Sequence, residues 1–314
     1  MVDPSLAEED TVDLLEWACM ADPEGFVAWT DIIGQLRSAM SEDEATETLQ
    51  EPANGITAEG ERSMEPYETI LNNWEEVLTY RAKACGLDMR YPFFVTKEGI
   101  EFRDGVSPAY AFQLLVSLGS NDAHHDGTSV YKLFEELSAS AAGQYLGSGN
   151  MAVVFGWPRR HPLSTGFRDA VRDLVGLLRE GEGCKDREGL HQLKDDGLDI
   201  VAWREFPDRR ASKLILFGQC ATGRRWKEKA HELRPDVWCK NNLIGTFAVD
   251  PVPAFFVPRA LSEKDADHYG KNQILLDRCR ISALYSGSSV DGLDERLREW
   301  IAAARDRGVD IDVK

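Results

Sequence analysis

The spacing of apolar residues along the chain predicts a mainly helical first half. Apolar positions recur every three or four residues in several stretches, which is the period of one buried helix face. The predicted amphipathic helices are residues 5–20, 25–40, 66–85, 129–145, 167–181, 262–284 and 292–308. A further helix is predicted from Ser107-Pro108 to Leu118, because serine suits the N-cap and proline the first helical turn.

Short apolar runs between these helices predict β-strands. Residues 91–95 and 99–103 flank Thr96-Lys97-Glu98, a pattern typical of a β-hairpin. Buried strands are predicted at residues 151–157, 197–203, 213–221 and 253–259. Strands and helices alternate from residue 129 onward, which indicates an α/β layer structure.

The charge is distributed unevenly and divides the chain into two parts. The net charge is −18, yet residues 1–130 contain 26 Asp+Glu against 7 Lys+Arg, and the remainder is nearly neutral. We therefore predict an acidic, mainly helical N-terminal region with a β-hairpin (1–128) and an α/β domain with C-terminal helices (129–314). Residues 41–64 are acidic and aperiodic and are predicted to form a linker or loop.

Composition excludes several classes of protein. No apolar run reaches the length needed to span a bilayer, and the N-terminus has no apolar signal core. Six scattered cysteines without a CxxC pair fit reduced thiols and argue against a zinc site or a disulfide framework. The sequence thus predicts a cytoplasmic protein with no membrane partner.

One group of polar residues indicates a metal-binding site. Asp199 opens one predicted strand, and Gln219 and Cys220 end the next. Magnesium prefers hard oxygen ligands, which the Asp199 carboxylate, the Gln219 side chain and the Cys220 carbonyl can supply. A second carboxylate can come from Glu135 or Glu136 on the preceding helix. This arrangement favours a site for Mg²⁺, or Mn²⁺, that acts on a phosphodiester.

These residues resemble the PD-(D/E)xK, or restriction-endonuclease-like, superfamily over residues 129–260. Mrr-like members carry Q-x-K at the second strand and an FE motif on the first helix, similar to Phe134-Glu135 here. The resemblance implies a mixed sheet flanked by helices and gives Glu135, Asp199 and Gln219 the acidic and glutamine positions. The lysine of the motif would fall at Ala221, so a lysine from the next helix is expected instead. Lys229 is preferred over Lys227 because it lies three residues from Trp226 and four from Leu233, at the border of the helix's apolar stripe.

The resemblance implies a metal-dependent endonuclease with DNA as its partner, of a kind that serves in restriction and anti-phage defence. The alternative is a catalytically inactive nuclease fold that acts as a scaffold or binding subunit, which Ala221 favours. The acidic N-terminal region is expected to dock a protein partner or to restrain the nuclease domain, or else only to maintain solubility. Self-association remains open. The paired His124-His125 is interpreted as a solvated loop, and Trp157, Trp203, Trp226 and Trp238 as core residues.

Overall fold

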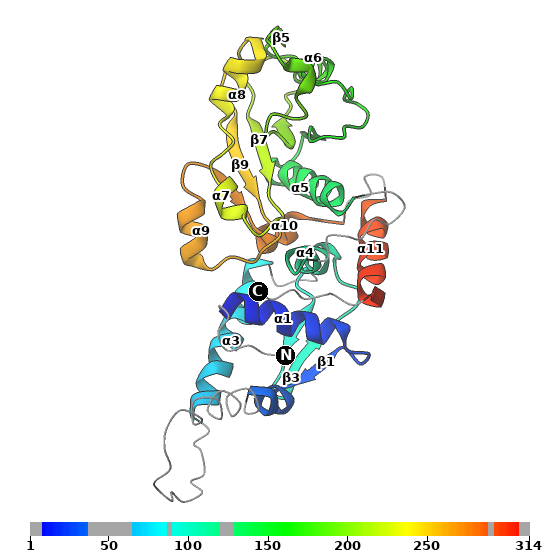
Figure 1. Cartoon of the computed structure of the whole chain (residues 1–314), viewed down its shortest axis with the longest axis vertical. Coiled ribbons are helices and arrows are strands. Elements are labelled where there is room, and N and C mark those ends of the chain that lie inside the picture. The colour runs from blue at the N-terminus through cyan, green and yellow to red at the C-terminus, as the bar shows by residue number, and fades with distance from the viewer. Residues whose placement is uncertain (1–7, 37–64, 87–89, 120–128, 288–291, 308–314) are drawn as a thin grey trace, which may run out of the picture. The chain divides into compact units, whose positions relative to one another are not determined.

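The computed structural model describes residues 8–36, 65–86, 90–119, 129–287 and 292–307. The chain forms two compact units, Met1–Val106 and Ser107–Lys314, each described by itself below (Figure 1). The predicted linker at 41–64 and the pair His124-His125 lie outside the described residues.

The first unit confirms the prediction of a mainly helical N-terminal region with a β-hairpin. Two long helices pack together, α1 (Glu8–Ala21) and α3 (Glu65–Ala84). The antiparallel sheet has the order β1-β3-β2, with β1 (Phe26–Ala28), β2 (Phe93–Val95) and β3 (Gly99–Phe102). The buried Arg81 of α3 bridges Asp13 and Glu16 of α1, at 2.8 and 3.0 Å.

The start of the predicted helix at 25–40 is wrong. Gly25 has a positive φ of 67°, and the next three residues form β1, which pairs with Gly99–Glu101 of β3. The helix begins only at residue 29 and is described to residue 36. A short apolar run next to an available strand edge therefore outweighs the helical periodicity.

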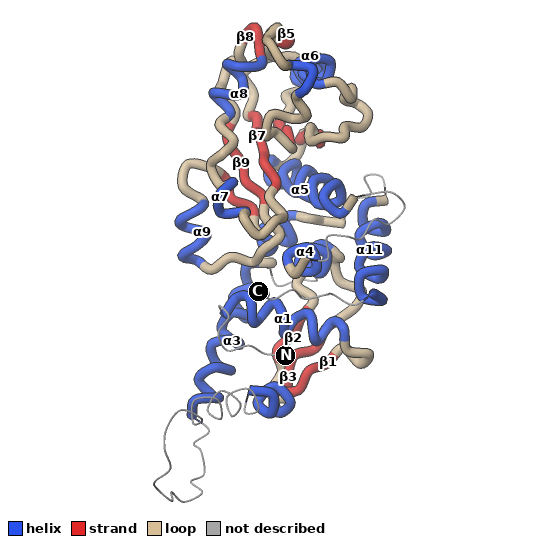
Figure 2. Tube along the Cα trace, viewed as in Figure 1, coloured by secondary structure: helices blue, strands red, loops and turns tan. Residues whose placement is uncertain are grey.

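The second unit is built on a five-stranded mixed sheet, which confirms the predicted α/β fold (Figure 2). The strand order is β10-β9-β7-β6-β4, where β4, β6 and β7 are antiparallel and β7, β9 and β10 are parallel. The strands are β4 (Asn150–Val154), β6 (Ile200–Arg204), β7 (Ile215–Cys220), β9 (Val252–Phe256) and β10 (Ile274–Leu276). A separate antiparallel pair consists of β5 (Glu182–Cys184) and β8 (Leu243–Gly245).

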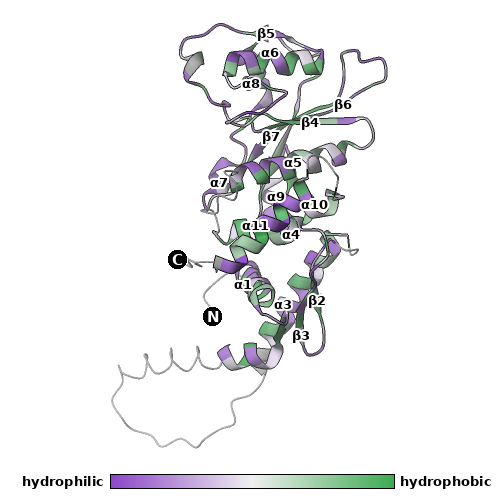
Figure 3. Cartoon of the chain, turned by 90° about the vertical axis from the view of Figure 1, so that its right-hand side faces the viewer, coloured by the Kyte–Doolittle hydropathy of each residue, from purple (hydrophilic) through white to green (hydrophobic). Residues whose placement is uncertain are grey.

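Helices cover both faces of this sheet. Helix α5 (Val130–Leu146) packs on β4, β6 and β7, and it contacts α4 (Ala109–Ser117), α10 (Arg278–Leu284) and α11 (Leu293–Arg307). The opposite face forms an apolar core with α6 (Phe167–Leu178) and α8 (Pro235–Asn242). Helix α6 carries hydrophobic and hydrophilic residues side by side, as expected of an amphipathic helix (Figure 3). Next to this core lie α7 (Trp226–Lys229) and α9 (Glu263–Tyr269).

The single helix predicted over 262–284 is wrong, because three elements occupy this stretch. Helix α9 ends at Tyr269, Asn272 has a positive φ of 61°, and α10 begins only at Arg278. Between the helices, the apolar residues of β10 pair in parallel with Ala254–Phe256 of β9. An edge strand, unlike a helix, lets this apolar run extend the sheet.

The boundary between the two units also differs from the predicted one at residue 128. The first unit ends at Val106, so α4 belongs to the second unit. The Phe112 ring packs edge-on against Trp300 of α11, with ring centroids 5.0 Å apart. Gln113 Nε2 donates to Ser282 Oγ of α10 at 3.3 Å. Helix α4 is thus part of the core that surrounds α5.

Candidate active site

The sheet places Asp199 and Gln219 side by side. Ile200 of β6 pairs with Gly218 of β7, so the register carried one residue further sets Asp199 opposite Gln219. Residues opposite one another in an antiparallel pair point to the same face. The Asp199 N–H donates to the Gly218 carbonyl at 2.9 Å, and the Cys220 N–H donates to Asp199 Oδ2 at 2.8 Å. The Asp199 side chain is therefore fixed against the end of β7.

The carboxyl group of Asp199 is half-buried and carries an unusual pKa. Burial raises this pKa to about 7, the Cys220 N–H lowers it, and nearby Asp195 raises it further. Lys132 and Lys229 also lower it through their positive charges. A carboxyl group in this state is readily ionised by a cation that binds beside it.

Glu135 approaches the same end of the sheet from helix α5. It is only 9% exposed, and burial followed by the charge of Asp199 raises its pKa to about 7. Its Oε2 accepts from Lys132 Nζ at 2.5 Å, and Lys132 Nζ also donates to the Gly156 carbonyl at 2.6 Å. Two carboxyl groups and a buried lysine thus form one electrostatic cluster.

Gln219 presents an unpaired oxygen. The residue is 5% exposed, and its Nε2 donates to Glu232 Oε2 at 3.1 Å, which directs the amide. Its Oε1 is buried and has no hydrogen-bond partner within the described part of the chain. A buried acceptor without a partner is unfavourable, so a ligand that binds this oxygen would stabilise the site.

The donors in this region fit a hard divalent cation. The described residues contain no cluster of three or more His, Cys, Asp or Glu side chains arranged for a metal. The site instead offers the carboxylates of Asp199 and Glu135, the free Gln219 Oε1 and the Cys220 carbonyl, all of them oxygens. Burial raises the pKa of the Cys220 thiol well above its ordinary value, so its sulfur is a poor ligand.

The lysine of the resembled motif has no counterpart on β7. Ala221 is buried in an apolar cluster with Trp226 and Phe255. The helix expected to supply the lysine is a single turn, α7, because the chain leaves the helical conformation at Ala230. On this turn Lys229 is exposed and lowers the pKa of Asp199, whereas Lys227 pairs with Asp265 of α9 at 3.4 Å.

Sequence reasoning missed three residues of this region: Lys132, Asp195 and Trp157. Lys132 precedes Glu135 by three residues, the spacing that puts two side chains on one helix face. Asp195 precedes Asp199 in a turn and accepts from the Gly197 N–H at 3.1 Å. Trp157 was interpreted as a core residue, but 48% of its surface is exposed. The three-residue spacing from Glu135 could have identified Lys132. The positions of Asp195 and Trp157 depend on how their loops fold, which the spacing does not reveal.

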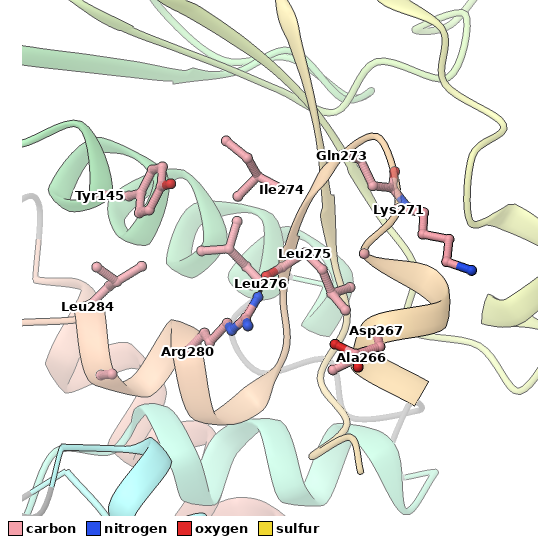
Figure 4. Close-up of a pocket in the computed structure, with 12 residues that line it drawn as sticks. Tyr145, Ala266, Asp267, Lys271, Gln273, Ile274, Leu275, Leu276, Arg280 and Leu284 are labelled. Atoms are coloured by element: carbon pink, nitrogen blue, oxygen red, sulfur yellow. Dashed lines mark hydrogen bonds between the residues drawn. The ribbon is translucent and has the colours of Figure 1, made fainter. Parts of the chain in front are cut away.

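A cavity of about 680 Å³ lies elsewhere in the second unit, and no candidate site residue lines it. Its walls come from the end of α5, from α9, β10 and α10 (Figure 4). Ile274, Leu275 and Leu276 make much of the wall apolar, and Arg280 Nη1 donates to the Leu275 carbonyl at 2.8 Å. The candidate chemistry is therefore not in this cavity.

Comparisons with known proteins give one structural similarity. The sequence matches no protein-family profile, and no curated protein sequence is similar to it. A solved structure of MspJI restriction endonuclease in complex with a 27-mer oligonucleotide aligns with a TM-score of 0.29 and 13% identity. The alignment covers 64% of this chain and 36% of that chain, so this chain matches about a third of MspJI. No helix among the described residues has the length and hydrophobicity to cross a membrane.

We expect Asp199→Asn to stabilise the metal-free protein at alkaline pH. Folding raises the pKa of Asp199 from 3.8 to about 7, so the stability that the protonated group contributes is lost as pH rises from about 4 to about 7, and the loss is complete above that. Asparagine has no charge to bury and can still accept from the Cys220 N–H. Thermal unfolding in EDTA at pH 8 should show a gain of ~3 °C or more, the scale of about 1 kcal/mol in a domain of this size. The gain should shrink at pH 5, and an equal gain at both pH values would contradict the assignment.

Gly156→Ala is expected to displace Glu135. A Cβ atom at residue 156 would lie 2.6 Å from Glu135 Oε2, closer than a van der Waals contact. The glutamate would have to turn away, which separates it from Lys132. We expect cleavage to fall ~10-fold or more and stability to fall by about 1–3 kcal/mol, the usual range for overpacking. Gly176→Ala, a helical position with open space, is the matched control; it should leave cleavage unchanged and raise stability by about 0.5–1 kcal/mol, because alanine is the better helix former. Unchanged cleavage by Gly156→Ala would remove Glu135 from the site.

Proposed function

We propose that this protein is a metal-dependent nuclease that hydrolyses phosphodiester bonds in DNA. The observation that carries the proposal is the cluster at the end of β7. There, the carboxyl groups of Asp199 and Glu135 interact and have raised pKa values, and lysines lie beside them. Asp199 also lies opposite Gln219, whose buried side-chain oxygen has no hydrogen-bond partner among the described residues. With an uncharged ligand, the two carboxyl groups would share the single buried Lys132 as their countercharge at neutral pH, whereas a cation bound to phosphate would neutralise both.

The residues of the cluster would have three roles: binding the metal, positioning Glu135 and stabilising charge on the phosphate. Asp199, Gln219 and the Cys220 carbonyl would hold Mg²⁺ or Mn²⁺, with Glu135 as a further carboxylate, and the ion would supply Lewis-acid polarisation of the phosphate and a lowered pKa of bound water. Lys132 holds the Glu135 carboxylate in place through its second bond to the Gly156 carbonyl. Lys229, exposed beside Asp199, can meet the negative charge that develops on the phosphate.

The direct test is cleavage of supercoiled plasmid by the full chain in Mg²⁺, in Mn²⁺ and in EDTA. We expect nicked and linear products with either metal and none with the chelator. Asp199→Asn protein purified in parallel is the control for contaminating nuclease. Absence of metal-dependent cleavage under all conditions would contradict the proposal.

A second candidate function is an inactive nuclease fold that serves as a scaffold or binding subunit. Ala221 favours it, because this residue replaces the motif's lysine and is buried among apolar side chains. Binding to DNA without cleavage in any metal would support this function. A role in restriction or anti-phage defence is part of the primary proposal and follows from the resemblance, whereas the proposed cytoplasmic location follows from the scattered cysteines.

We expect the acidic first unit to weaken DNA binding through charge. Glu24, Asp31, Glu76 and Glu98 are exposed, so changing all four to their amides removes charge without disturbing the core. Affinity for a DNA duplex should rise ~3-fold or more at low salt and converge with the wild type at high salt, where charges are screened beyond about 10 Å. Binding that is unchanged at every salt concentration would leave a partner contact or solubility as the role of this unit.

A further inference from the structure

Trp157 differs from the other tryptophans of this chain. The other seven are at most 8% exposed, whereas Trp157 is 48% exposed. An aromatic ring of this size contributes large apolar area when it is buried, so its exposure is unfavourable unless something covers it. The position of the ring identifies what could cover it.

Trp157 lies at the edge of the candidate active site. It directly follows Gly156, whose carbonyl accepts from Lys132 Nζ and whose N–H donates to the Asp199 carbonyl at 3.0 Å. The Trp157 N–H itself points at Asp195 Oδ2, 3.5 Å away. The backbone that carries the ring is thus bonded to the residues that would act on the phosphate.

The ring is held by a second loop that supplies positive charge. Lys194 Nζ lies 4.9 Å from the centroid of the Trp157 ring, within the range of a cation–π contact. The buried Arg159 joins the two loops, because its guanidinium donates to the Lys194 carbonyl and, at 2.9 Å, to the Thr165 carbonyl. Arg159 also packs over the Phe155 ring, 4.5 Å from its centroid. The indole and the ammonium group are therefore positioned before any ligand arrives.

We propose that Trp157 stacks on an unpaired base next to the scissile phosphate, with Lys194 pairing to a flanking phosphate. This inference rests on the proposed nuclease function and specifies its substrate. A base within a duplex is already stacked on both faces, so only an unpaired base can offer a face to the indole. The preferred substrate is then DNA with an unpaired nucleotide at the cleavage position, either in a single strand or extruded from a duplex.

The test measures DNA binding by the full chain in an Asp199→Asn background, in EDTA, so that cleavage does not interfere. The probes are a fluorescein-labelled single-stranded oligodeoxynucleotide, the matching duplex and the same duplex with one bulged nucleotide. Adding Trp157→Ala should weaken binding of the single strand ~10-fold, the scale of one lost base stack, and leave the intact duplex within about twofold. Trp157→Phe should retain most of the affinity, since the phenyl ring can still stack. A matching loss on the bulged duplex would identify an extruded base as an accepted substrate, and a loss on the single strand alone would restrict the site to single strands.

Phe206→Ala is the matched control. Phe206 is 50% exposed in the same unit but follows the far end of β6, so its loss should not change affinity for any probe. A scan of abasic positions through the single strand adds a readout that altered folding cannot imitate. The protein that keeps Trp157 should bind more weakly to the oligonucleotide with an abasic site at one particular position. The Trp157→Ala variant should bind that oligonucleotide as well as it binds the intact single strand.

The outcomes separate this inference from the proposed function. Cleavage by the wild type together with full single-strand affinity in Trp157→Ala would overturn the stacking role and leave the nuclease. Position-specific loss in the abasic scan without cleavage in any metal would support stacking and overturn the nuclease. Failure of the protein to bind any of the three probes, together with absence of cleavage by the wild type in any metal, would overturn both.

Discussion

Asp199→Asn is expected to reduce DNA cleavage by about 10³-fold or more, because a metal-holding carboxylate contributes several kcal/mol to transition-state stabilisation. Asp199 is fixed by the Cys220 N–H at 2.8 Å and lies opposite Gln219, so no other carboxylate on these strands can take its place. Asparagine keeps the volume and the acceptor oxygen, and the fold should therefore be retained. The measurement is the initial rate of plasmid cleavage at saturating Mg²⁺, compared between the wild type and Asp199→Asn.

The control for this variant is Asp208→Asn. Asp208 lies in the exposed turn after β6 and accepts from the Arg210 N–H and Nε, so this change removes the same charge far from Asp199 along the strand. It should cleave at the wild-type rate. Addition of Mg²⁺ at pH 8 should raise the unfolding temperature of the wild type and of Asp208→Asn, but not that of Asp199→Asn. Cleavage by Asp199→Asn within tenfold of the wild type would refute the site.

Local sequence signals predicted the elements whose ends are chemically marked. Ser129 caps α5 at the start of the helix predicted from residue 129 by accepting from the Tyr131 N–H, and Gly86, with a positive φ of 87°, follows the helix predicted to residue 85. The strands β6 and β7 follow from apolar runs, and their order in the chain brings Asp199 next to Gln219. These features depend on contacts within a few residues or between consecutive strands, which a single sequence can reveal.

The errors arose where distant pairing decided the structure. Periodicity favoured helix at Phe26–Ala28 and at Ile274–Leu276, but both stretches pair with strands that the sequence pattern did not connect to them. The same limit applies to the site. Lys132 reaches its second partner, the Gly156 carbonyl, only because α5 packs on β4. Trp157 is exposed although the two residues before it in the loop after β4 are buried, which periodicity does not predict.

Lys229→Ala is expected to lower the turnover number by ~10²-fold, the usual effect of losing one electrostatic donor to the transition state. Its effect should be largely on kcat, because an exposed lysine that meets developing charge contributes little before the reaction begins. Lys227→Ala is the matched control, since Lys227 lies two residues away on the same turn but pairs with Asp265. Full activity of both single variants and of the double variant would mean that no lysine of α7 takes part.

Lys132→Met should behave differently, which separates the two lysines. Lys132 is buried, holds the Glu135 carboxylate and lowers the pKa of both Glu135 and Asp199. Its removal raises both pKa values, so cleavage should need a higher pH and a higher Mg²⁺ concentration to reach its maximum. Lys229→Ala should leave the metal requirement nearly unchanged, since Lys229 lowers the pKa of Asp199 less than Lys132 does. Rates measured across pH and Mg²⁺ for both variants decide between these roles. If Lys132→Met lowers kcat with no shift in either profile, then Lys132 meets the transition-state charge itself, in the role that we assign to Lys229.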